Sequence, residues 1–497
     1  MVRLKFGLGW LAVLIFAYSF TSNSIVAQSP SFTISGKVTE PPSGSGTPIP
    51  AATVVLTLNS SNQMMTQTDA GGNFSFGSIP QGSNYDVAVT KPGYTFNPAS
   101  QGGTNIQFDR TLFFTGAASG ATFQFSQTEY TVNESSPSVT LTVIRTGNSS
   151  AAASIAYQTA DTDTFTVACS DTTHNGGGAF ARCDYATTLD TLTFAPGEAS
   201  KNFTVPIIND SFAEGDETFS VVLSNAQGAA LGSPATATVR IIDNDAVTGP
   251  NPIFTTPFFV RQHYLDFLSR EPEAGEPWSA VLNNCSDVNN NPACDRLTVS
   301  GAFFGSPEFQ LKGYFVYRFY KLAFNRLPLY TEIVADMRAV TGQTSGEVFQ
   351  KKGAFTSAFV LRPEFTNGFG PMTNAAYVSA LMSRYSLTQI TTPDPANPDG
   401  SNKVTLSTAD LTNQLNAGTL TRAQVLRAIA DSDQVASLEF NNAFVAMQYY
   451  GYLRRAPEQS GFDSWLNYLN THPGDSRTMV NGFMNSAEYR MRFGPPQ

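Results

Sequence analysis

The sequence predicts a multidomain protein in which two all-β sandwiches are followed by an all-α repeat domain. Its 497 residues exceed the usual length of one domain, and 41% of them are hydrophobic, which is enough for several cores. From about residue 31 to residue 245, short runs of alternating apolar and polar residues are separated by Gly, Pro and Asn clusters, as in sandwiches. After residue 254 the alternation gives way to helical spacing.

The beginning of the chain has the pattern of an export signal. Arg3 and Lys5 precede the apolar run Gly7–Phe20, and the small residues of Ile25–Ala27 offer a cleavage site. An uncleaved anchor is the alternative, although the run is shorter than the roughly 20 residues of a membrane-spanning helix. We therefore expect a signal peptide over residues 1–27 and a mature protein, secreted or at the cell surface, without a membrane span.

Export also predicts that the four cysteines form disulfides. Pairing neighbours along the chain closes the shortest loops, which gives the bonds Cys169–Cys183 and Cys285–Cys294. The alternative for the first pair is a metal site completed by His174 and Asp184. An oxidising compartment and a spacing unlike that of common zinc sites favour the disulfide.

The first sandwich is expected over residues 31–116. Strand-like runs alternate there with turn residues, and Thr68–Phe76 (TDAGGNFSF) places a tight turn between two strands. With the preceding PIPAATVVL (Pro48–Leu56) and the later GYTFNP (Gly93–Pro98), these motifs resemble the carboxypeptidase regulatory-like family. The resemblance implies a small transthyretin-like sandwich without catalytic activity, in which Asp69 is a turn residue.

A helical domain is expected over residues 254–497, after a linker over residues 246–253. In Thr256–Arg270 a threonine can cap the helix, a proline suits its first turn, and the apolar residues fall on one face. The stretch Phe258–Asn283 recurs as Phe444–Asn470, which indicates an internal repeat.

Each of these two copies is followed by a similar helix end, and weaker copies are expected at Val316–Thr366 and Tyr377–Phe440. The recurring pattern R-x-P, G, W and S-x-E-[FY] resembles an uncharacterised helical repeat of exported bacterial proteins, which is similar to phycobilisome-linker domains. The resemblance implies an all-α fold and little about activity. The insert Thr391–Asn402 is expected to be a surface loop.

The negative charge of the chain lies in its middle region, residues 119–245. That region carries four Lys and Arg against fourteen Asp and Glu, a net charge of −10, whereas residues 1–118 carry +1 and residues 246–497 carry −1. The acids stand at expected strand ends and are densest in Asn209–Phe219 (NDSFAEGDETF). If such ends meet at one pole of a sandwich, their carboxylates repel unless a cation joins them. The sequence has no basic patch, so we expect no nucleic-acid partner.

Carboxylate oxygens at strand ends favour Ca²⁺, because this ion accepts six to eight oxygens in forgiving geometry, whereas Mg²⁺ is stricter and softer metals would require His or Cys. The motifs V-N-E, C-D-Y, T-F-A-P-G-E, V-P-I-I-N-D, E-G-D-E-T-F and I-I-D-N-D resemble a Calx-β domain over nearly all of residues 119–245. The resemblance implies an immunoglobulin-like sandwich that binds calcium at one pole. It implies the candidate ligands Glu134, Asp184, Asp210, Glu214, Asp243 and Asp245.

Two features of this motif set depart from the family pattern. Asn209 and Asn244 stand where calcium-binding copies often have Asp, which lowers the charge of the site. Asp216 and Glu217 belong to the motif but are interpreted as partly structural. The alternative to a calcium site is that the acids only solvate loop ends.

Enzyme signatures do not occur in the sequence: it has no H-E-x-x-H, no G-x-S-x-G and no phosphate-binding G-x-x-x-x-G-K. Glu308 and Glu488 occupy equivalent repeat positions, which favours a capping or packing role over the paired carboxylates of a glycosidase. We expect a non-enzymatic protein with a calcium-stiffened spacer and a helical region that meets a protein or glycan partner. The alternatives are an extracellular carbohydrate-active enzyme with its active site in the helical region, and self-assembly.

Overall fold

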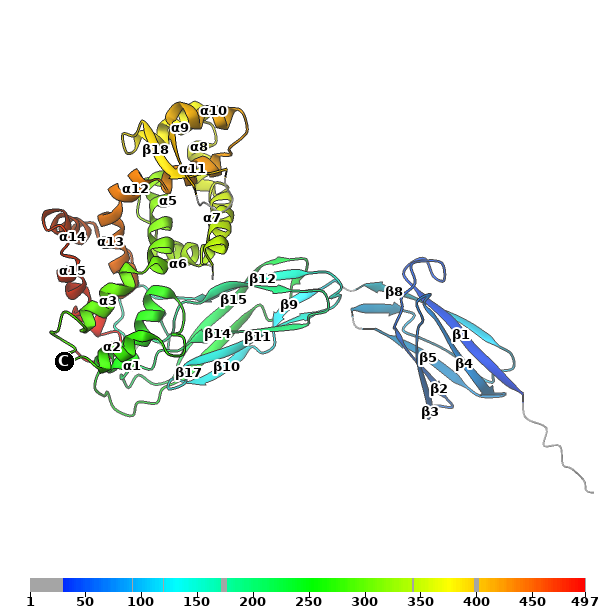
Figure 1. The fold of residues 1–497 in the computed structure, drawn as a ribbon. Coiled ribbons are helices and arrows are strands. Elements are labelled where there is room, and N and C mark those ends of the chain that lie inside the picture. Colours follow the sequence, from blue (N-terminus) through cyan, green and yellow to red (C-terminus); the bar gives the residue numbers. More distant parts are fainter. Residues whose placement is uncertain are drawn as a thin grey trace, which may run out of the picture. The chain divides into compact units, whose positions relative to one another are not determined.

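The computed structural model describes residues 30–91, 93–118, 120–170, 177–341, 344–396 and 402–496. The expected signal peptide over residues 1–27 lies outside the described residues. The chain divides into two compact units, Met1–Ser119 and Gly120–Gln497. The predicted fold class is confirmed: strands form sandwiches up to about residue 245, and a helical region follows (Figure 1).

Two four-stranded sheets form the first unit, in the orders β4-β1-β8-β6 and β3-β2-β5-β7. Every second residue of β2 is buried, so the alternation seen in the sequence is that of a sandwich with one face of each sheet in the core. Asp69 forms the predicted turn, since its Oδ1 accepts hydrogen bonds from the amides of Gly71 and Asn73 at 2.9 and 2.8 Å. The strands are β1 (Ser31–Thr39), β2 (Thr53–Leu58), β3 (Asn62–Gln67), β4 (Asn73–Pro80), β5 (Tyr85–Thr90), β6 (Tyr94–Asn97), β7 (Ser100–Gly103) and β8 (Arg110–Ala118).

The second unit begins with another sandwich, whose sheets have the strand orders β10-β17-β15-β12-β13 and β14-β11-β9-β16. Its core contains the stacked rings of Tyr157 and Phe203, with centroids 3.7 Å apart, and those of Tyr185 and Phe219, 3.9 Å apart. The strands are β9 (Thr122–Phe125), β10 (Glu129–Asn133), β11 (Ser138–Thr146), β12 (Ala153–Ala160), β13 (Leu189–Phe194), β14 (Ser200–Pro206), β15 (Glu217–Gln227), β16 (Ala230–Leu231) and β17 (Thr236–Ile242).

The rest of the second unit is helical and contains one hairpin that the sequence did not predict. Strands β18 (Gln389–Pro393) and β19 (Lys403–Ser407) pair antiparallel. The insert expected as a surface loop, Thr391–Asn402, therefore begins inside a strand, where Thr392 is buried. Among the described residues, no helix has both the length and the hydropathy that crossing a bilayer requires. The helices are η1 (Pro252–Phe254), α1 (Thr256–His263), η2 (Tyr264–Leu268), α2 (Pro277–Asn283), α3 (Arg296–Gly305), α4 (Pro307–Phe309), η3 (Gln310–Tyr314), α5 (Phe315–Phe324), α6 (Tyr330–Ala339), α7 (Ser345–Phe359), α8 (Pro363–Phe369), α9 (Asn374–Ser383), α10 (Thr408–Asn416), α11 (Arg422–Ala430), α12 (Asp433–Leu438), α13 (Phe440–Gln448), η4 (Tyr449–Leu453), α14 (Gln459–Thr471), α15 (Ser476–Met484) and α16 (Ala487–Arg490).

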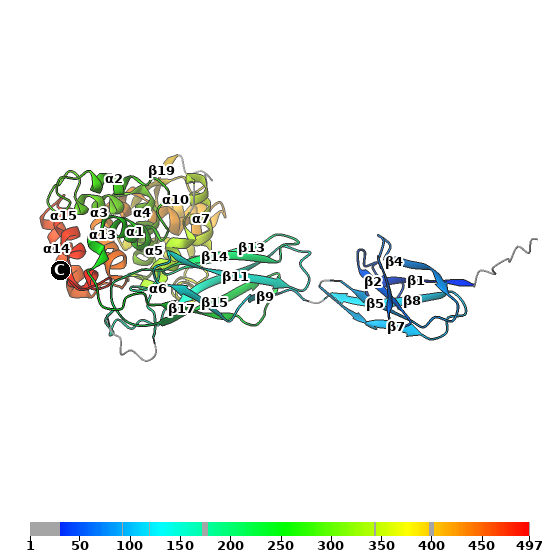
Figure 2. The ribbon, with the colours of Figure 1, turned by 90° about the horizontal axis from the view of Figure 1, so that it is seen from below.

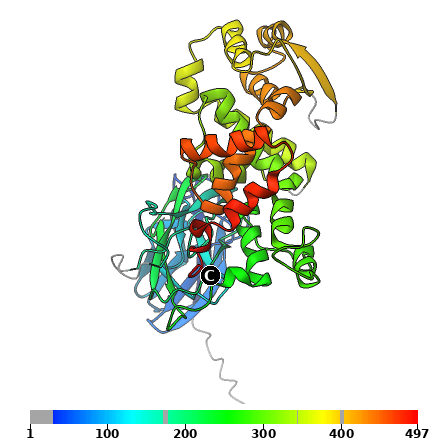
Figure 3. The same cartoon turned by 90° about the vertical axis from the view of Figure 1, so that its left-hand side faces the viewer.

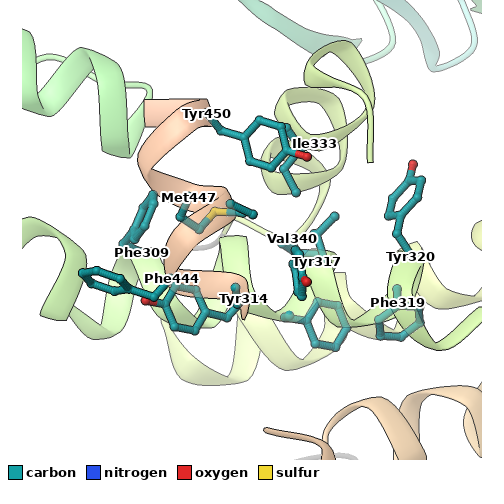
Figure 4. Close-up of a cluster of buried hydrophobic side chains, with 14 of the residues drawn as sticks. Phe309, Tyr314, Tyr317, Phe319, Tyr320, Ile333, Val340, Phe444, Met447 and Tyr450 are labelled. Atoms are coloured by element: carbon teal, nitrogen blue, oxygen red, sulfur yellow. The ribbon is translucent and has the colours of Figure 1, made fainter. Parts of the chain in front are cut away.

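A core rich in aromatic side chains holds the helices together. Figure 4 shows part of it, with Tyr314 and Tyr317 from the η3–α5 segment beside Phe444 and Met447 from α13. All four side chains are buried, which removes large apolar surfaces from water and is the main stabilising contribution of this region. The many Phe and Tyr residues of the sequence are therefore used as packing.

Three of the four expected repeat copies contain the same triad of Tyr, Arg and Glu. In each, an arginine lies over the ring of a tyrosine six positions earlier and forms an ion pair with a glutamate in the third helix after it. The ion-pair distances are 3.2, 2.7 and 2.6 Å. In the third copy, Tyr385 instead donates to Glu439 at 2.8 Å. The triads are Tyr264, Arg270 and Glu308; Tyr320, Arg326 and Glu364; and Tyr449, Arg455 and Glu488.

The helices pack on one end of the second sandwich (Figures 1 and 2). The guanidinium of Arg261 on α1 donates to the carbonyls of Ile207 and Pro137 at 2.9 and 2.8 Å, and Arg338 on α6 pairs with Asp190 at 2.7 Å. The main helical core also takes in side chains of the sandwich. The sandwich and the helical region therefore form one compact unit.

The end of the chain returns to the sandwich, as Figure 3 shows near the C-terminus. Arg492 is buried, and its guanidinium binds both carboxylate oxygens of Asp266 at 3.0 Å and the carbonyl of Arg182 at 2.6 Å. Asn251, in the segment expected as a linker, is also buried and donates to the carbonyl of Gly494 at 2.9 Å. The segment between sandwich and helices is thus packed against the last turns of the chain.

His263 supplies a pH-dependent contribution to stability. It is fully buried, with Nδ1 2.8 Å from the carbonyl of Phe259 and Nε2 2.8 Å from the Ser300 hydroxyl, and burial lowers its pKa to about 4. The unfolded state therefore binds a proton below pH 6.5 that the folded state takes up only near pH 4. We expect the free energy of unfolding to fall by about 3 kcal/mol from this residue as the pH drops through that window.

Urea unfolding of the wild type and of His263→Gln at several pH values measures this contribution. The variant should show a shallower loss between pH 6.5 and pH 4, and the exposed His472→Gln serves as the matched control. Equal slopes for all three proteins would contradict the assignment.

Candidate metal centre

The topology of the second sandwich brings acidic strand ends together. Strand β10 runs parallel to β17, and β15 runs antiparallel to β17, so the residues that follow β10 and β17 lie beside the first residue of β15. These residues are Glu134, Asp243 and Glu217. The expectation that strand-end acids share one pole therefore agrees with the strand register.

Two groups of three carboxylates form at this pole. Within each group, one oxygen of every residue lies within 4.8 Å of the others. Both groups contribute to the wall of one cavity of about 10 Å³, which has room for a body of about the size of a water molecule. The groups are Glu134, Asp243 and Asp245, and Asp184, Glu214 and Glu217.

Backbone amides hold several of these side chains in place. Asp243 accepts three amides: Glu214 and Gly215 donate to its Oδ2 at 2.9 and 2.7 Å, and Asp245 donates to Oδ1 at 2.7 Å. Glu134 accepts the amide of Asp210 at 2.8 Å. The loops before β15 and after β17 are therefore joined through the carboxylates themselves, and the oxygens are positioned before any ligand arrives.

Burial makes ionisation of these acids unfavourable. Loss of solvent raises the pKa of both Glu134 and Asp184 to about 7, against ordinary values of 4.5 and 3.8. Burial, reinforced by the neighbouring charge of Asp184, raises the pKa of Glu217 to about 10 and that of Glu214 to about 11. Burial and the charge of Asp184 also raise the pKa of Asp210. Full ionisation of the pole thus requires a compensating positive charge.

Ion pairs within the described part of the chain do not supply that charge. Among the described residues, no Lys or Arg forms an ion pair with any member of the two carboxylate groups. Moreover, Oδ2 of Asp210, Oδ2 of Asp245 and Oδ1 of Asn209 are buried without a hydrogen-bond partner among those residues. Buried oxygens without donors are costly for a fold, and a bound cation would satisfy them.

The structure places the six predicted ligands as follows. Five of them belong to the two carboxylate groups. The sixth, Asp210, is buried beside them, where the charges of Asp184 and Glu134 act on it, but it is in neither group. Asn209 turns an oxygen inward, whereas Asn244 is exposed.

Glu217 joins a carboxylate group, whereas the sequence predicts a partly structural role for it. The signal that could have found it is the alternation of β15: Glu217 shares the inward face with Phe219 and Val221, both of which are buried. Asp216 precedes the strand and forms an ion pair with Arg240 at 2.5 Å. More than a third of each of these two side chains is exposed to solvent. The two neighbours therefore have different roles.

Both predicted disulfides, Cys169–Cys183 and Cys285–Cys294, are present. The first packs with Val167, Phe180 and Phe212 in a small apolar cluster next to the carboxylates. Because its sulfurs are bonded to each other, they are not thiolate ligands, and His174 of the alternative metal site lies outside the described residues. This bond instead braces the segment that ends in Asp184.

Comparisons with known proteins match three parts of the chain to family models. Residues 117–245 match the Calx-beta domain, residues 33–107 the carboxypeptidase regulatory-like domain, and residues 434–493 a domain of unknown function, DUF4214. These matches confirm the resemblances stated from the sequence.

Curated relatives match the chain over about a quarter of its length. Sodium/calcium exchanger 1 of Mus musculus is 34% identical over 139 residues, and sodium/calcium exchanger Calx of Drosophila melanogaster is 33% identical over 122 residues. Each match covers 24% of this chain, but only 13% and 11% of the respective exchanger. A solved structure, the apo-form Calx CBD1 domain, is 31% identical and covers 25% of this chain and 99% of its own, with a TM-score of 0.21.

The carboxylate pole predicts opposite outcomes for two adjacent substitutions in a chelator-treated protein. The pKa of Glu217 is raised in the folded state, so this acid lowers the stability of the fold as the pH rises above about 4.5. Glu217→Gln removes that cost, and it should raise the free energy of unfolding by on the order of 1 kcal/mol at pH 8 and by less at pH 5.

Asp216→Asn is the matched control, since it removes only a solvent-exposed ion pair, and it should leave the stability unchanged or slightly lower. Thermal unfolding in EDTA at the two pH values measures both variants. A loss of stability in Glu217→Gln at pH 8 would show that this side chain is not under charge repulsion.

Proposed function

We propose that the chain is an exported, non-enzymatic modular protein whose second sandwich binds Ca²⁺ at the carboxylate pole. The observation that carries this proposal is the convergence of two carboxylate groups on one cavity, with no partner cation among the described residues. The match of residues 117–245 to the Calx-beta model and the names of the relatives, which are sodium/calcium exchangers, support calcium as the ion.

The donor set fits calcium better than other ions. It consists of carboxylate oxygens, with no His or Cys in either group, and hard oxygens are the ligands that Ca²⁺ prefers. The buried oxygens of Asp210 and Asp245 have no hydrogen-bond partner among the described residues, so they are free to coordinate an ion. Ca²⁺ accepts such irregular surroundings, whereas Mg²⁺ demands near-octahedral geometry.

The ion would also stiffen the joint between the sandwich and the helices. Ser211 directly follows Asp210, and its amide and hydroxyl both donate to the carbonyl of Phe493, at 3.1 and 3.2 Å. The carbonyl of Ser211 in turn accepts the amide of Gly249 at 2.8 Å. Holding the loop that contains Asp210 would therefore hold the end of the helical region.

Secretion or surface location is supported by the export pattern of the sequence and by the two disulfides. A non-enzymatic role is supported by the two glutamates considered for a glycosidase, because Glu308 and Glu488 are each held by an arginine of a repeat triad. The helical region would then be the part that meets a protein or glycan partner.

Calcium should raise the melting temperature of the full chain. At a free concentration a hundred times the Kd, binding to the folded state adds about 2.7 kcal/mol, which corresponds to a rise of several degrees. Asp243→Ala should abolish the rise, because it removes a ligand and the acceptor of three amides.

Differential scanning calorimetry with Ca²⁺, and with EDTA as reference, measures this effect, and Asp216→Asn is the control that should keep it. No calcium-dependent rise in the wild type would refute the proposed site.

The coupling to the helical region predicts a second, local effect. Ca²⁺ should slow amide hydrogen exchange in the loop that contains Ser211 and in residues 489–494, because these segments are joined by hydrogen bonds. The first sandwich, residues 31–118, belongs to the other compact unit and provides the internal control. If protection rises only in the loop, the ion binds without stiffening the joint.

A further inference from the structure

A pocket of about 380 Å³ lies in the helical region and is lined by residues of α7, β18 and α11. Figure 1 labels these three elements. Its volume is in the range of small-ligand sites. It belongs to the third expected repeat copy and its neighbour, where the Tyr–Arg–Glu triad is replaced and the hairpin is inserted. The pocket is far along the chain from the carboxylate pole and uses none of its residues.

Arg427 is held in a fixed orientation at the wall of this pocket. Its guanidinium lies over the ring of Phe349 at 4.0 Å from the centroid. Gly353 leaves the space beside it, since a Cβ at that position would stand 3.3 Å from Nη1. The ion pair with Asp431 is long, at 3.7 Å, so the planar group keeps the capacity for a closer anionic partner.

Positive charge exceeds negative charge around Asp431. This carboxylate is paired closely with Arg318, at 3.1 Å, while Lys352 stands 4.0 Å away in addition to Arg427. Asp394, another acid of the pocket wall, binds the amide of Ala396 at 2.9 Å. Burial lowers the pKa of Lys352, so an added anion nearby would favour its charged form.

Hydroxyl and amide groups also line the pocket. Ser357 donates its hydroxyl to the carbonyl of Gly353 at 3.0 Å, so its oxygen can still accept a hydrogen bond from a ligand. Gln350 adds a side-chain amide to the wall. These groups give a ligand polar partners in addition to Arg427.

We propose that this pocket binds a small acidic sugar of the uronic acid class. Its carboxylate pairs with the guanidinium of Arg427, and its hydroxyls bond to polar groups of the wall such as the hydroxyl of Ser357 and the amide of Gln350. The combination of one anchored cation with several hydroxyl and amide groups matches a ligand that carries one carboxylate and several hydroxyls. The inference deepens the interaction role proposed for the helical region and names the glycan chemistry, but it does not depend on calcium.

Isothermal titration calorimetry on the full chain with saturating Ca²⁺ tests the proposal, with galacturonate and glucuronate as probes and galactose and glucose as neutral controls. At least one uronate should bind, and its neutral counterpart should bind at least tenfold more weakly. Arg427→Gln should weaken uronate binding at least tenfold. Absence of binding by both uronates, equal binding of the neutral sugars, or unchanged binding by Arg427→Gln would each overturn the proposal.

The calcium-dependent rise in melting temperature, measured on every variant, shows that the protein is folded. If uronate binds but calcium has no effect, the proposed calcium site fails and the pocket stands; the reverse result rejects the pocket alone.

Discussion

The main physical constraint on this molecule is the repulsion among carboxylates that lie close together at one buried end of the second sandwich. The strand register brings Glu134, Asp243 and Glu217 together whether or not their charges are balanced, because the hydrophobic faces of the strands determine that register. Backbone amides donate hydrogen bonds to some of these carboxylates, whereas burial and the neighbouring charge of Asp184 raise the pKa of Glu217. The fold therefore carries an electrostatic cost that a divalent cation is suited to remove.

The same loops carry the contacts with the helical region, so the pole is an internal joint and not a free tip. Ser211 is one residue from Asp210, and the buried Arg492 reaches the carbonyl of Arg182 two residues before Asp184. A bound ion would therefore hold the same short segments that the last turns of the chain contact. A small change in the loops at the pole would be transmitted to the helices through hydrogen bonds and not through a flexible linker.

The helical region combines repetition with one departure. A repeated Tyr–Arg–Glu triad fixes the helix ends of three copies by the same cation–π contact and ion pair. In the remaining copy the triad gives way to a Tyr385–Glu439 contact and an inserted hairpin, and it is there that a pocket opens. Where the Tyr–Arg–Glu triad is absent, polar groups such as Arg427 line a cavity.

Much of this architecture could be predicted from the sequence, because local patterns encode it. Alternation with a period of two predicted the sandwiches, and the acidic strand ends together with the resemblance to a Calx-β domain indicated five members of the two carboxylate groups. The inward position of Glu217 follows from the same alternation. Its place in a run of acids favoured a partly structural role instead. The pairing of cysteines close in the chain needed no tertiary information.

Only the tertiary structure decided the features that join distant residues. Asn251 meets the last turns of the chain, and Arg427 lies on Phe349 from another helix, because packing of separate elements creates these contacts and no periodicity marks them. The hairpin of β18 and β19 has the same origin, since its strands are short and gain their stability from the helices around them. The sequence by itself determined the kinds of elements and their charges, and the fold decided which of them meet.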